Sequence, residues 1–540
     1  MLTCSGQHSI RKAVPLNRSS PVIAVKFINK DHALRVGRLQ AKQLQLEINL
    51  HMLVSGHENI IRYLNHGSDQ TWSWIALELA DGGDLFDKIE SDEGVPEDIA
   101  HFYFKQLINA IAWCHGKGVA HRDIKPENML LNAQGDLKLA DFGLATKYLD
   151  TRTGQEKICG TVCGSPPYIA PEIVRIFDEH RKRNRDNQDG RQKPGYRAGP
   201  TDIWSCAIVL FVLLAGNTPW DMPTEERSQE YSDFLYTNGK PEDELWAKVP
   251  FEVLSLIRGM LRPNPEERFS LAEIRAHPWF TRPNRYMNEQ GKTTDSVALA
   301  TRMMERLHID FTAIPTSRPT MDIDNHTPDQ DWHTAFAATQ PETPLEDVAV
   351  DWEAPPRLAA FHGVSASQPT TSLDRNREPT SRPAFNDHFA HQLSQDPSMS
   401  QFTQSHQLPL TLTQAAKQFK DIAPAHTLTR FYSAMAPRQL LELLTAALHE
   451  LNVPTSGTGA ARYQSVADGG GVYIWVKTMD SRKQELKGDV IVEPVSDDGL
   501  LEVRFSKAKG DPLEWRRLFK RVTVLCRDAV IVPRENAMFG

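Results

Sequence analysis

Apolar residues recur at regular spacing up to about residue 280 and again after about residue 426, with little periodicity in between. The β-branched run from Val22 to Ile28 predicts a strand, and the segment from Gln40 to Val54 predicts a helix. A longer helix is predicted to end near Cys114. The residues expected on the buried faces are Leu46, Leu50 and Leu53 in the first helix and Ala100, Phe104, Leu107, Ile108 and Ile111 in the second. Periodic segments joined by short turns indicate a folded domain, which we assign to residues 1–284.

The next stretch, residues 285–425, is rich in Thr, Ser, Pro, Gln, Asp and His. Such a composition buries too little apolar surface to offset the entropy lost on ordering, so we predict a mostly disordered linker. Within it, the residues from Asp295 to Leu307 have the pattern of a short helix.

Periodicity returns in residues 426–540, where we predict a second, small α+β domain. Leucines between Leu440 and Leu451 indicate an amphipathic helix, and alternation around Ile474 and Val503 indicates strands. A last helix has Trp515 and neighbouring apolar residues on one face. Its other face is basic and carries Arg516, Arg517, Lys520 and Arg521.

Composition narrows the class of protein. Across 540 residues the net charge is −8, which argues against direct DNA binding over the whole surface. The six cysteines lack paired metal-ligand spacing and point to a reducing compartment. The longest apolar run, from Cys206 to Ala215, is too short to cross a bilayer and predicts a buried core helix. No signal peptide is recognisable at the N-terminus. We therefore expect a cytosolic or nuclear protein that is not integral to a membrane.

The sharpest chemical signal is the run from His121 to Asn128, His-Arg-Asp-Ile-Lys-Pro-Glu-Asn. Phosphoryl transfer requires a carboxylate to accept the proton of the attacking hydroxyl, together with metal ligands and cations that spread negative charge. Asp123 can accept the proton, and Lys125 can reach the transferred phosphate. Asn128 and Asp141, the latter in Asp-Phe-Gly, can ligate Mg²⁺. The short apolar runs between these two loops predict a hairpin that holds them side by side.

These loops resemble the signature set of the protein kinases, which implies a bilobal α+β protein-kinase fold and ATP with Mg²⁺ as cofactors. The resemblance implies that Ala170-Pro171-Glu172 closes the activation segment and that Arg268 pairs with its glutamate. It implies that Asp202 holds the backbone of the catalytic loop. Ser165 stands where serine/threonine kinases keep a hydroxyl near the catalytic residues, which favours Ser or Thr as the acceptor.

The same resemblance assigns the ATP-binding residues. Lys26 would bind the α- and β-phosphates, with Glu47 on the following helix as its ion-pair partner. Glu78 and Ala80 would offer backbone groups to adenine, and Asp84 lies where kinases have an acid near the ribose.

One feature departs from the kinase pattern. Kinases cover the phosphates with a glycine-rich loop before the lysine, whereas the only glycine before Lys26 is Gly6. We therefore expect an N-lobe truncated at the glycine-rich loop. Two explanations stay open, a mis-assigned start with residues missing or an enzyme with a poorer lid, and we favour missing sequence.

Further motifs resemble one group of kinases, the DNA-damage checkpoint effector kinases. These are the runs 163–172 and 216–221 in the kinase region, and 503–515 near the C-terminus. The resemblance implies a C-terminal kinase-associated domain and phosphorylation of cell-cycle regulators, such as the phosphatase that activates cyclin-dependent kinase. It also implies an upstream kinase of the ATM/ATR class, a 14-3-3 protein as a further partner, and a location in the nucleus and the cytoplasm.

Ser-Gln and Thr-Gln pairs, which ATM/ATR-class kinases select, are frequent in the linker. We predict regulatory phosphorylation at Ser367, within a motif resembling that of the checkpoint kinases, and at Ser394 and Ser400. A second basic feature is the polar stretch from Arg181 to about Lys193. It predicts a solvated loop, with a nuclear-import patch as the alternative.

Two hypotheses refine this picture. Glu127 and Asp84 could share an arginine three residues before the acceptor, which predicts Arg-x-x-Ser/Thr substrates. The basic helix near the C-terminus could bind the acidic substrate cleft of its own kinase and inhibit it. The rival interpretations are a related nutrient- or calcium-regulated kinase with a similar tail, and a pseudokinase scaffold that lost turnover with its lid.

Overall fold

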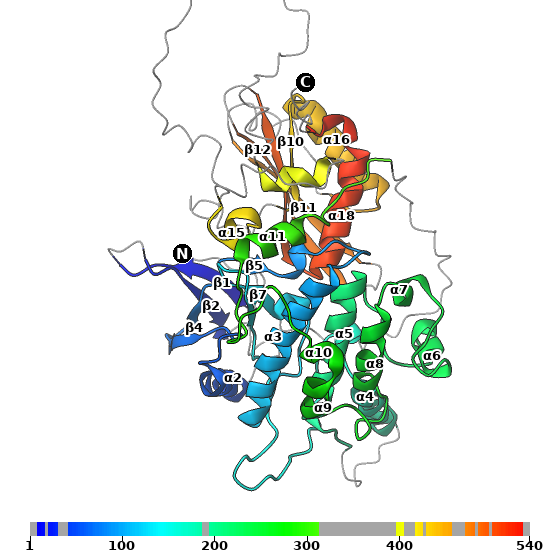
Figure 1. Ribbon diagram of the computed structural model, residues 1–540. Coiled ribbons are helices and arrows are strands. Elements are labelled where there is room, and N and C mark those ends of the chain that lie inside the picture. Colours follow the sequence, from blue (N-terminus) through cyan, green and yellow to red (C-terminus); the bar gives the residue numbers. More distant parts are fainter. Residues whose placement is uncertain are drawn as a thin grey trace, which may run out of the picture.

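The computed structural model describes residues 8–16, 20–30, 41–185, 194–312, 396–403, 416–424, 428–455, 470–480, 484–495 and 499–532. Figure 1 shows a two-lobed body with a third, C-terminal unit stacked on it. The smaller lobe (N-lobe) is mostly sheet, and the larger lobe (C-lobe) is mostly helical. The predicted bilobal α+β arrangement is therefore present in the described residues.

The N-lobe sheet carries the predicted lysine strand at an inner position. Its order is β1 (His8–Ala13), β2 (Ile23–Asn29), β4 (Trp72–Glu78) and β3 (Tyr63–Ser68), all antiparallel. β2 pairs Lys26 with Ile75, and the lobe's small core gathers Ile28, Ile48 and Ile75. The expected truncation of the glycine-rich loop concerns residues 1–7, which lie outside the described residues, and stays a prediction.

Helix α2 (Ala41–Val54) forms where the sequence predicts it, but with a different buried face. Leu46 and Leu53 are each 41% exposed, and of the predicted stripe only Leu50 is buried. The prediction of that stripe was wrong because the inward face carries polar residues. Glu47 and His51 are buried there beside Ile48 and Val54.

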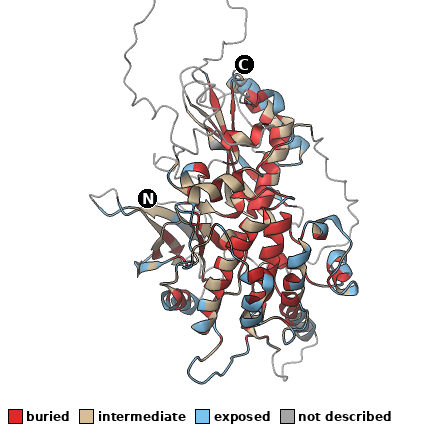
Figure 2. Cartoon of the chain, in the orientation of Figure 1, coloured by how far each residue is buried: buried red, intermediate tan, exposed pale blue. Residues whose placement is uncertain are grey.

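Two long helices form the centre of the C-lobe. α3 (Glu97–Gly116) buries the residues predicted for it, and α5 (Ala198–Ala215) is buried along nearly its whole length. Figure 2 shows this buried interior, in red, continuing from α3 and α5 towards α18. α5 is the one helix in the described part of the chain that is long and apolar enough to span a membrane. Because 94% of its apolar window is buried inside the protein, it serves as a core helix.

Short elements complete the C-lobe around these two helices. The predicted hairpin between the catalytic loops is β7 (Met129–Leu131) with β8 (Leu137–Leu139), paired from Met129 opposite Leu139. The other short elements are β5 (Gly83–Asp84), η1 (Phe86–Lys88), β6 (Val119–Ala120), η2 (Pro126–Asn128), β9 (Thr146–Lys147), η3 (Pro166–Tyr168), α6 (Gln229–Tyr236), α7 (Glu244–Ala247), α8 (Phe251–Met260), α9 (Leu271–Ala276) and α10 (Pro278–Thr281).

The loop predicted after the Ala-Pro-Glu motif begins as a helix instead. α4 runs from Pro171 to Arg185, so the basic residues 181–185 form its last turns, and residues 186–193 lie outside the described residues. At the start of α4, Glu172 accepts two hydrogen bonds from Arg268, at 2.9 and 3.0 Å, and both residues are buried. This is the ion pair that the sequence predicts.

Packing continues past the predicted boundary at residue 284. α11 (Ser296–Met304) confirms the short helix expected in the linker, and Leu299 and Met303 belong to the C-lobe core. α15 (Phe419–Ile422) inserts Phe419 into the same core, and η6 (Pro397–Phe402) packs against the C-terminal unit. The prediction of a disordered linker is therefore wrong for residues 285–312, 396–403 and 416–424, which bury apolar residues against folded parts.

The C-terminal unit is the predicted α+β domain, which we call the tail domain. Its sheet has the order β10 (Arg430–Ser433), β13 (Leu501–Lys509), β12 (Glu485–Pro494) and β11 (Val472–Met479). α16 (Pro437–Glu450) and α18 (Pro512–Leu525) share a core with this sheet. Leu428 and Leu513 of this unit instead join the C-lobe core, so the tail domain and the kinase lobes pack as one body.

The buried pair between Glu172 and Arg268 gives a stability prediction. Replacing Arg268 by methionine leaves the carboxylate of Glu172 buried without its partner, which should lower the free energy of unfolding by about 3–5 kcal/mol. Urea denaturation followed by tryptophan fluorescence measures this change. Arg285→Met is the matched control, because its pair with Asp98 is 64% exposed on the arginine side and should change stability by less than about 1 kcal/mol. Equal effects of the two substitutions would contradict the assignment.

Candidate active site

Lys26, the lysine predicted to bind ATP, is held by two carboxylates between the lobes. Lys26 on β2 donates to Oε1 of Glu47 on α2 at 2.7 Å and to Oδ1 of Asp141 at 3.0 Å. Lys26 is 5% exposed and Glu47 is 6% exposed. The pairing predicted for Lys26 and Glu47 is therefore formed, and it draws Asp141 to the same place.

The cluster of Lys26, Glu47 and Asp141 sets the charge state of Asp141, the predicted metal ligand. Burial alone would raise the pKa of Asp141, but the ammonium of Lys26 outweighs it and lowers the pKa to about 2. For Lys26, burial acts to lower the pKa, and the charges of Asp141 and Glu47 raise it above its ordinary value. Near neutral pH the lysine is thus a cation and Asp141 an anion, the states that phosphate and metal binding require.

Phe142 fixes the loop that carries Asp141. Its ring lies between those of His51 on α2 and His121 in the catalytic loop, with centroid distances of 4.8 and 5.0 Å. Burial lowers the pKa of His51 to about 4, so that imidazole is neutral and packs as an apolar ring. The position of α2 and the position of the metal-binding loop are therefore coupled through one buried aromatic side chain.

The catalytic loop forms a closed polar network around Asp123. Asp123 Oδ2 lies 2.9 Å from Lys125 Nζ, and Asp123 Oδ1 accepts a hydrogen bond from Ser165 Oγ at 3.1 Å. Lys125 also donates to Ser165 at 3.0 Å. Asn128 donates its amide to the backbone oxygen of Asp123 at 2.7 Å, which leaves the amide oxygen as its metal-binding atom. The predicted residues Asp123, Lys125, Asn128 and Ser165 are therefore brought together.

A buried aspartate holds the backbone of this loop. The carboxylate of Asp202 accepts from the amides of His121 and Arg122, at 2.9 and 2.8 Å. Arg122 has a φ of 64°, a left-handed conformation that a non-glycine residue adopts only when its surroundings hold it there. Asp202 thus stabilises the turn that presents Asp123, as the sequence resemblance implied.

The activation segment is tied to the catalytic loop by a residue that the sequence reasoning missed. Tyr196, which follows the insertion, accepts a hydrogen bond from Arg122 Nη1 at 3.1 Å and donates one to the carbonyl of Thr161 at 2.8 Å. Its backbone pairs with that of Cys159 through two bonds of 2.8 Å. Gly195 permits this approach, because a Cβ there would lie 2.3 Å from Ile158. No sequence motif signals the contact, which joins segments distant in the chain.

The residues predicted to meet adenine lie at the end of β4, in the hinge between the lobes: Glu78 is the last residue of that strand, and Ala80 follows it. The Glu78 carboxylate pairs with Lys138 at 2.8 Å, and the Ala80 carbonyl accepts a hydrogen bond from the amide of Gly83 at 3.0 Å. Asp84, assigned to the ribose, accepts from the amide of Phe86 at 2.8 Å. Its other oxygen lies 3.8 Å from Nζ of Lys507 in the tail domain, so this carboxylate faces a second partner.

Glu127, the predicted substrate-binding acid, sits in η2 close to this contact. Its Oε2 is buried and has no hydrogen-bond partner among the described residues. Burial raises the pKa of Glu127 against the opposing effect of Lys125. A buried carboxylate oxygen without a donor favours binding of an external cation.

Of the predicted regulatory serines, only one lies within the described residues. Ser367 and Ser394 lie outside them, and phosphorylation at all three positions stays a prediction. Ser400 lies in η6, next to Gln401, which is 1% exposed and accepts hydrogen bonds from Arg516 at 3.2 and 3.3 Å.

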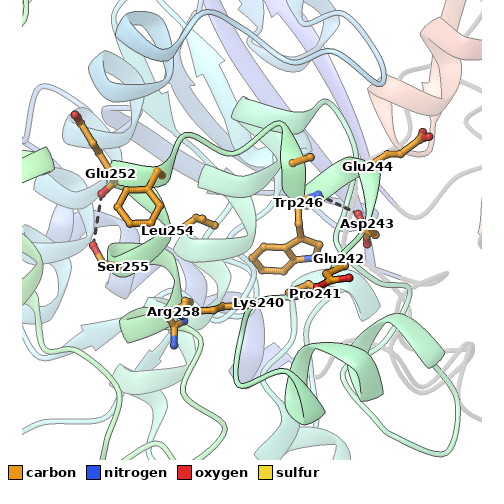
Figure 3. Close-up of a pocket in the computed structure, with 12 residues that line it drawn as sticks. Lys240, Pro241, Glu242, Asp243, Glu244, Trp246, Glu252, Leu254, Ser255 and Arg258 are labelled. Atoms are coloured by element: carbon orange, nitrogen blue, oxygen red, sulfur yellow. Dashed lines mark hydrogen bonds between the residues drawn. The ribbon is translucent and has the colours of Figure 1, made fainter.

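A pocket of about 870 Å³ opens elsewhere, on the C-lobe around α7 and α8 (Figure 3). The indole of Trp246 lies at its centre, with Asp243, Leu254 and Arg258 around it. None of the predicted catalytic or ATP-binding residues lines this pocket, so it has no part in phosphoryl transfer.

The assembled residues fit ATP with a divalent metal. Lys26 and Lys125 supply cations for phosphate oxygens, and Asp141 and Asn128 supply two oxygen ligands of the kind that hard divalent cations take together with phosphates and water. Bound ATP and metal would supply the transferable phosphoryl group and charge neutralisation. Asp123 would hold the acceptor hydroxyl and take up its proton.

Comparison with known proteins agrees with this geometry. The family model described as "Protein kinase domain" matches residues 5–280, so the chain belongs to the protein kinase family. Serine/threonine-protein kinase chk1 of Schizosaccharomyces pombe is 36% identical over 512 residues, covering 93% of this chain and 91% of that protein. Serine/threonine-protein kinase CHK1 of Saccharomyces cerevisiae is 33% identical over 525 residues, covering 95% and 93%.

Within that family, the chain is a serine/threonine protein kinase of the Chk1 group. CBL-interacting serine/threonine-protein kinase 16 of Arabidopsis thaliana is 37% identical, but over only 48% of this chain and 51% of that protein. The similarity to the Chk1 kinases thus extends through the tail domain. The prediction of a checkpoint-type kinase is confirmed, and the alternative of a nutrient- or calcium-regulated relative is not favoured.

Asp123→Asn tests the role of the central carboxylate. Removing the proton acceptor should lower kcat by roughly 10²–10⁴-fold. ATP binding should be retained because Lys26, Glu47 and Asp141 stay in place. Phosphate transfer to a peptide and binding of a fluorescent ATP analogue are measured on the same preparation. Transfer at a near-normal rate by the variant would remove Asp123 from the mechanism.

Proposed function

We propose that this protein is a Mg²⁺- and ATP-dependent serine/threonine kinase that acts in the DNA damage and replication checkpoint. The observation that carries the catalytic part is the joined network of Asp123, Lys125, Ser165 and Asn128, facing the cluster of Lys26 and Asp141. The similarity to Chk1 kinases along more than nine-tenths of the chain supports the checkpoint role.

Magnesium is the metal that the ligand set favours. Two protein oxygen ligands, from Asp141 and Asn128, leave positions for phosphate oxygens and water, as Mg²⁺ requires. The described residues contain no cluster of three or more His, Cys, Asp or Glu that would favour a softer or more fully caged metal.

The pseudokinase alternative is not supported by the catalytic residues. A scaffold that binds nucleotide without transfer has no use for a proton-accepting aspartate held by three polar partners. The ion pair of Lys26 and Glu47, at 2.7 Å, is likewise the arrangement of a kinase poised for catalysis.

Substrates are proposed to carry arginine three residues before the acceptor. Asp84 and Glu127 are both partly buried carboxylates near the catalytic loop, and the buried Oε2 of Glu127 lacks a donor in the described structure. A guanidinium can bind two carboxylates through its fork of N–H groups, which an ammonium cannot do equally well.

A positional peptide array tests this preference. Replacing the arginine by alanine should lower kcat/KM by about ten- to a hundredfold, because charge-assisted hydrogen bonds contribute roughly 1.5–3 kcal/mol. Glu127→Gln should reduce the ratio between the two peptides. An array indifferent to that arginine would refute the proposed substrate class.

The wider roles proposed for the chain rest on its similarity to the checkpoint kinases. Its substrates would include the cell-cycle phosphatase that activates cyclin-dependent kinase, and an ATM/ATR-class kinase would phosphorylate Ser367, Ser394 and Ser400. A 14-3-3 protein would bind the modified linker. The protein would act in the nucleus and in the cytoplasm, with residues 426–540 as a kinase-associated domain.

Autoinhibition by the tail domain is the regulatory part of the proposal. Arg516 of α18 is fully buried and donates to Glu90 at 2.9 Å, while Lys520 donates to the other oxygen of Glu90 at 2.6 Å. Arg517 bonds to Asp92 at 2.8 and 3.1 Å. The sequence predicts that the basic face of this helix binds the acidic cleft around Asp84 and Glu127. In the structure that face contacts Glu90 and Asp92 of the kinase instead (Figure 1).

The Arg516 side chain joins three parts of the chain. Besides Glu90 of the kinase, it donates to Gln401 of η6 and to the carbonyl of Leu428 at 3.0 Å. Glu90 and Asp92 come shortly after β5 and η1 in the sequence, in the segment that follows the hinge. A tail domain held here restricts both substrate access and movement of the hinge.

A double-mutant cycle on the ion pair of Arg517 and Asp92 tests whether the docked tail domain restrains the kinase. Asp92→Asn keeps a residue that tolerates the φ of 65° at this position, and Arg517→Met removes the partner charge. Each change should raise kcat/KM on a peptide by roughly two- to fivefold, since such a pair contributes up to about 1 kcal/mol.

The double variant should be no more active than either single one, because both remove the same contact. Additive effects, or no effect at all, would contradict restraint by this interface. Point changes are preferred to deletion of the tail domain, because deletion would expose the C-lobe surface now covered by Leu428 and Leu513.

A further inference from the structure

Lys507 is an unusual residue for its place in the tail sheet. Along β13 the side chains of Val503 and Phe505 are buried in the tail core, and strand alternation puts position 507 on the same face. An apolar residue is expected there, yet the chain has a lysine whose side chain is only 14% exposed. A buried ammonium requires carboxylate partners.

A β-bulge interrupts the regular backbone of β13 beside Lys507. Lys509 pairs with Lys487 and Lys507 pairs with Gly488, so Ala508 is the extra residue of a β-bulge. Bulges redirect the side chains beside them. Gly488 is required opposite, because a Cβ there would lie 2.3 Å from both Ser506 O and the Trp515 ring. The strand thereby carries Lys507 beyond the tail core to the kinase.

Lys507 Nζ donates to the carbonyl of Gly510 at 3.5 Å, and its charged partners are the acids of the proposed substrate subsite. Its Nζ lies 3.8 Å from Asp84 Oδ2, and the charges of Asp87, Asp84, Glu127 and Asp511 all favour its cationic form. Two neighbouring lysines are engaged elsewhere: Lys125 bonds to Asp123 and Ser165, and Lys88 donates to the carbonyl of Asp84 at 3.3 Å. Lys507 is therefore the cation of the tail domain that faces both Asp84 and Glu127, while Lys125 of the kinase also acts on Glu127.

Lys507 does not satisfy both carboxylates of the proposed subsite. A single ammonium at 3.8 Å from one carboxylate leaves Glu127 Oε2 buried without a donor in the described structure. A guanidinium, with its planar fork of N–H groups, could satisfy both acids at once. The subsite therefore binds Lys507 less completely than it would bind an arginine.

We infer that Lys507 occupies the subsite for the substrate's arginine, so that the tail domain competes with peptides at this one residue. The inference rests on the proposed Arg-x-x-Ser/Thr preference. Because Lys507 makes the weaker contact, an arginine-bearing substrate displaces it, whereas a peptide without that arginine gains nothing from the subsite. The tail domain thus sharpens selection for arginine as well as restraining the kinase.

The experiment uses the full-length chain and two peptides that differ only in arginine or alanine three residues before the acceptor. For Lys507→Ala, KM for the arginine peptide should fall by about three- to tenfold, because the competing cation is gone. Its kcat should not change, because in the described structure Lys507 contacts none of the residues that surround Asp123. KM for the alanine peptide should move by less than twofold.

Two further variants sharpen the result. Lys507→Arg keeps the positive charge and adds the planar N–H donors of a guanidinium. The tail domain should then compete more strongly, so KM for the arginine peptide should rise. Lys509→Ala is the matched control: it lies two residues along the same strand, and its partner at 3.2 Å is Glu485 of the tail domain itself. It should leave both peptides unaffected.

The possible results distinguish a failure of the arginine preference from a failure of the role given to Lys507. If the arginine preference holds but Lys507→Ala leaves KM unchanged, or lowers KM equally for both peptides, occupancy of the subsite by Lys507 is wrong. If wild type already uses both peptides with equal kcat/KM, the proposed substrate class fails and this inference fails with it. A fall in KM confined to the arginine peptide supports both.

Discussion

The buried contact of Lys26 with Glu47 and Asp141 is the interaction on which the active site depends. Each carboxylate comes from a different element, Glu47 from α2 and Asp141 from the loop after β8, and the lysine comes from the N-lobe sheet. Three charges in an interior are stable only if all are paired, since removing one leaves an uncompensated buried charge. The orientation of the two lobes is therefore specified by electrostatics, while Phe142, packed between two histidine rings, sets the same geometry through shape.

Buried charges are also paired at the boundary between the kinase and its tail domain. There the buried charges are Glu90 on the kinase and Arg516 on α18, both essentially inaccessible to solvent. Arg516 and Lys520 hold the pKa of Glu90 below its ordinary value although burial acts in the opposite direction. A contact of this kind gives specificity of docking more than raw affinity, because its desolvation cost nearly cancels the attraction. The proposed autoinhibition would therefore respond to small changes in charge at this contact.

Much of the fold was predictable from local pattern, and most of the site from motifs. The helices at 97–116 and 512–525, the strands at 472–479 and 501–509, and the catalytic residues lie where the sequence indicates. The buried face of α2 was misread because Glu47 and His51 turn inward for catalytic reasons, so the leucine pattern misleads. The packing of α11 and α15 was also missed, because a few apolar residues in a polar stretch become significant only when a partner surface is known. Tyr196 and Lys507 act across long sequence separations that no local pattern encodes.

The closed arrangement also explains why the linker can be long. Its described ends are fixed on the same interface: the amide of Ile309 donates to the carbonyl of Gln401 at 2.9 Å, and Gln401 in turn receives Arg516. Because closing a longer chain loop adds only about 0.6 kcal/mol for each doubling of its length, insertions between these ends change the closed state little. The two contacts proposed to restrain the kinase, Arg516 with Glu90 and Lys507 with Asp84, lie on one helix and the strand before it, so a single displacement of the tail domain would release both.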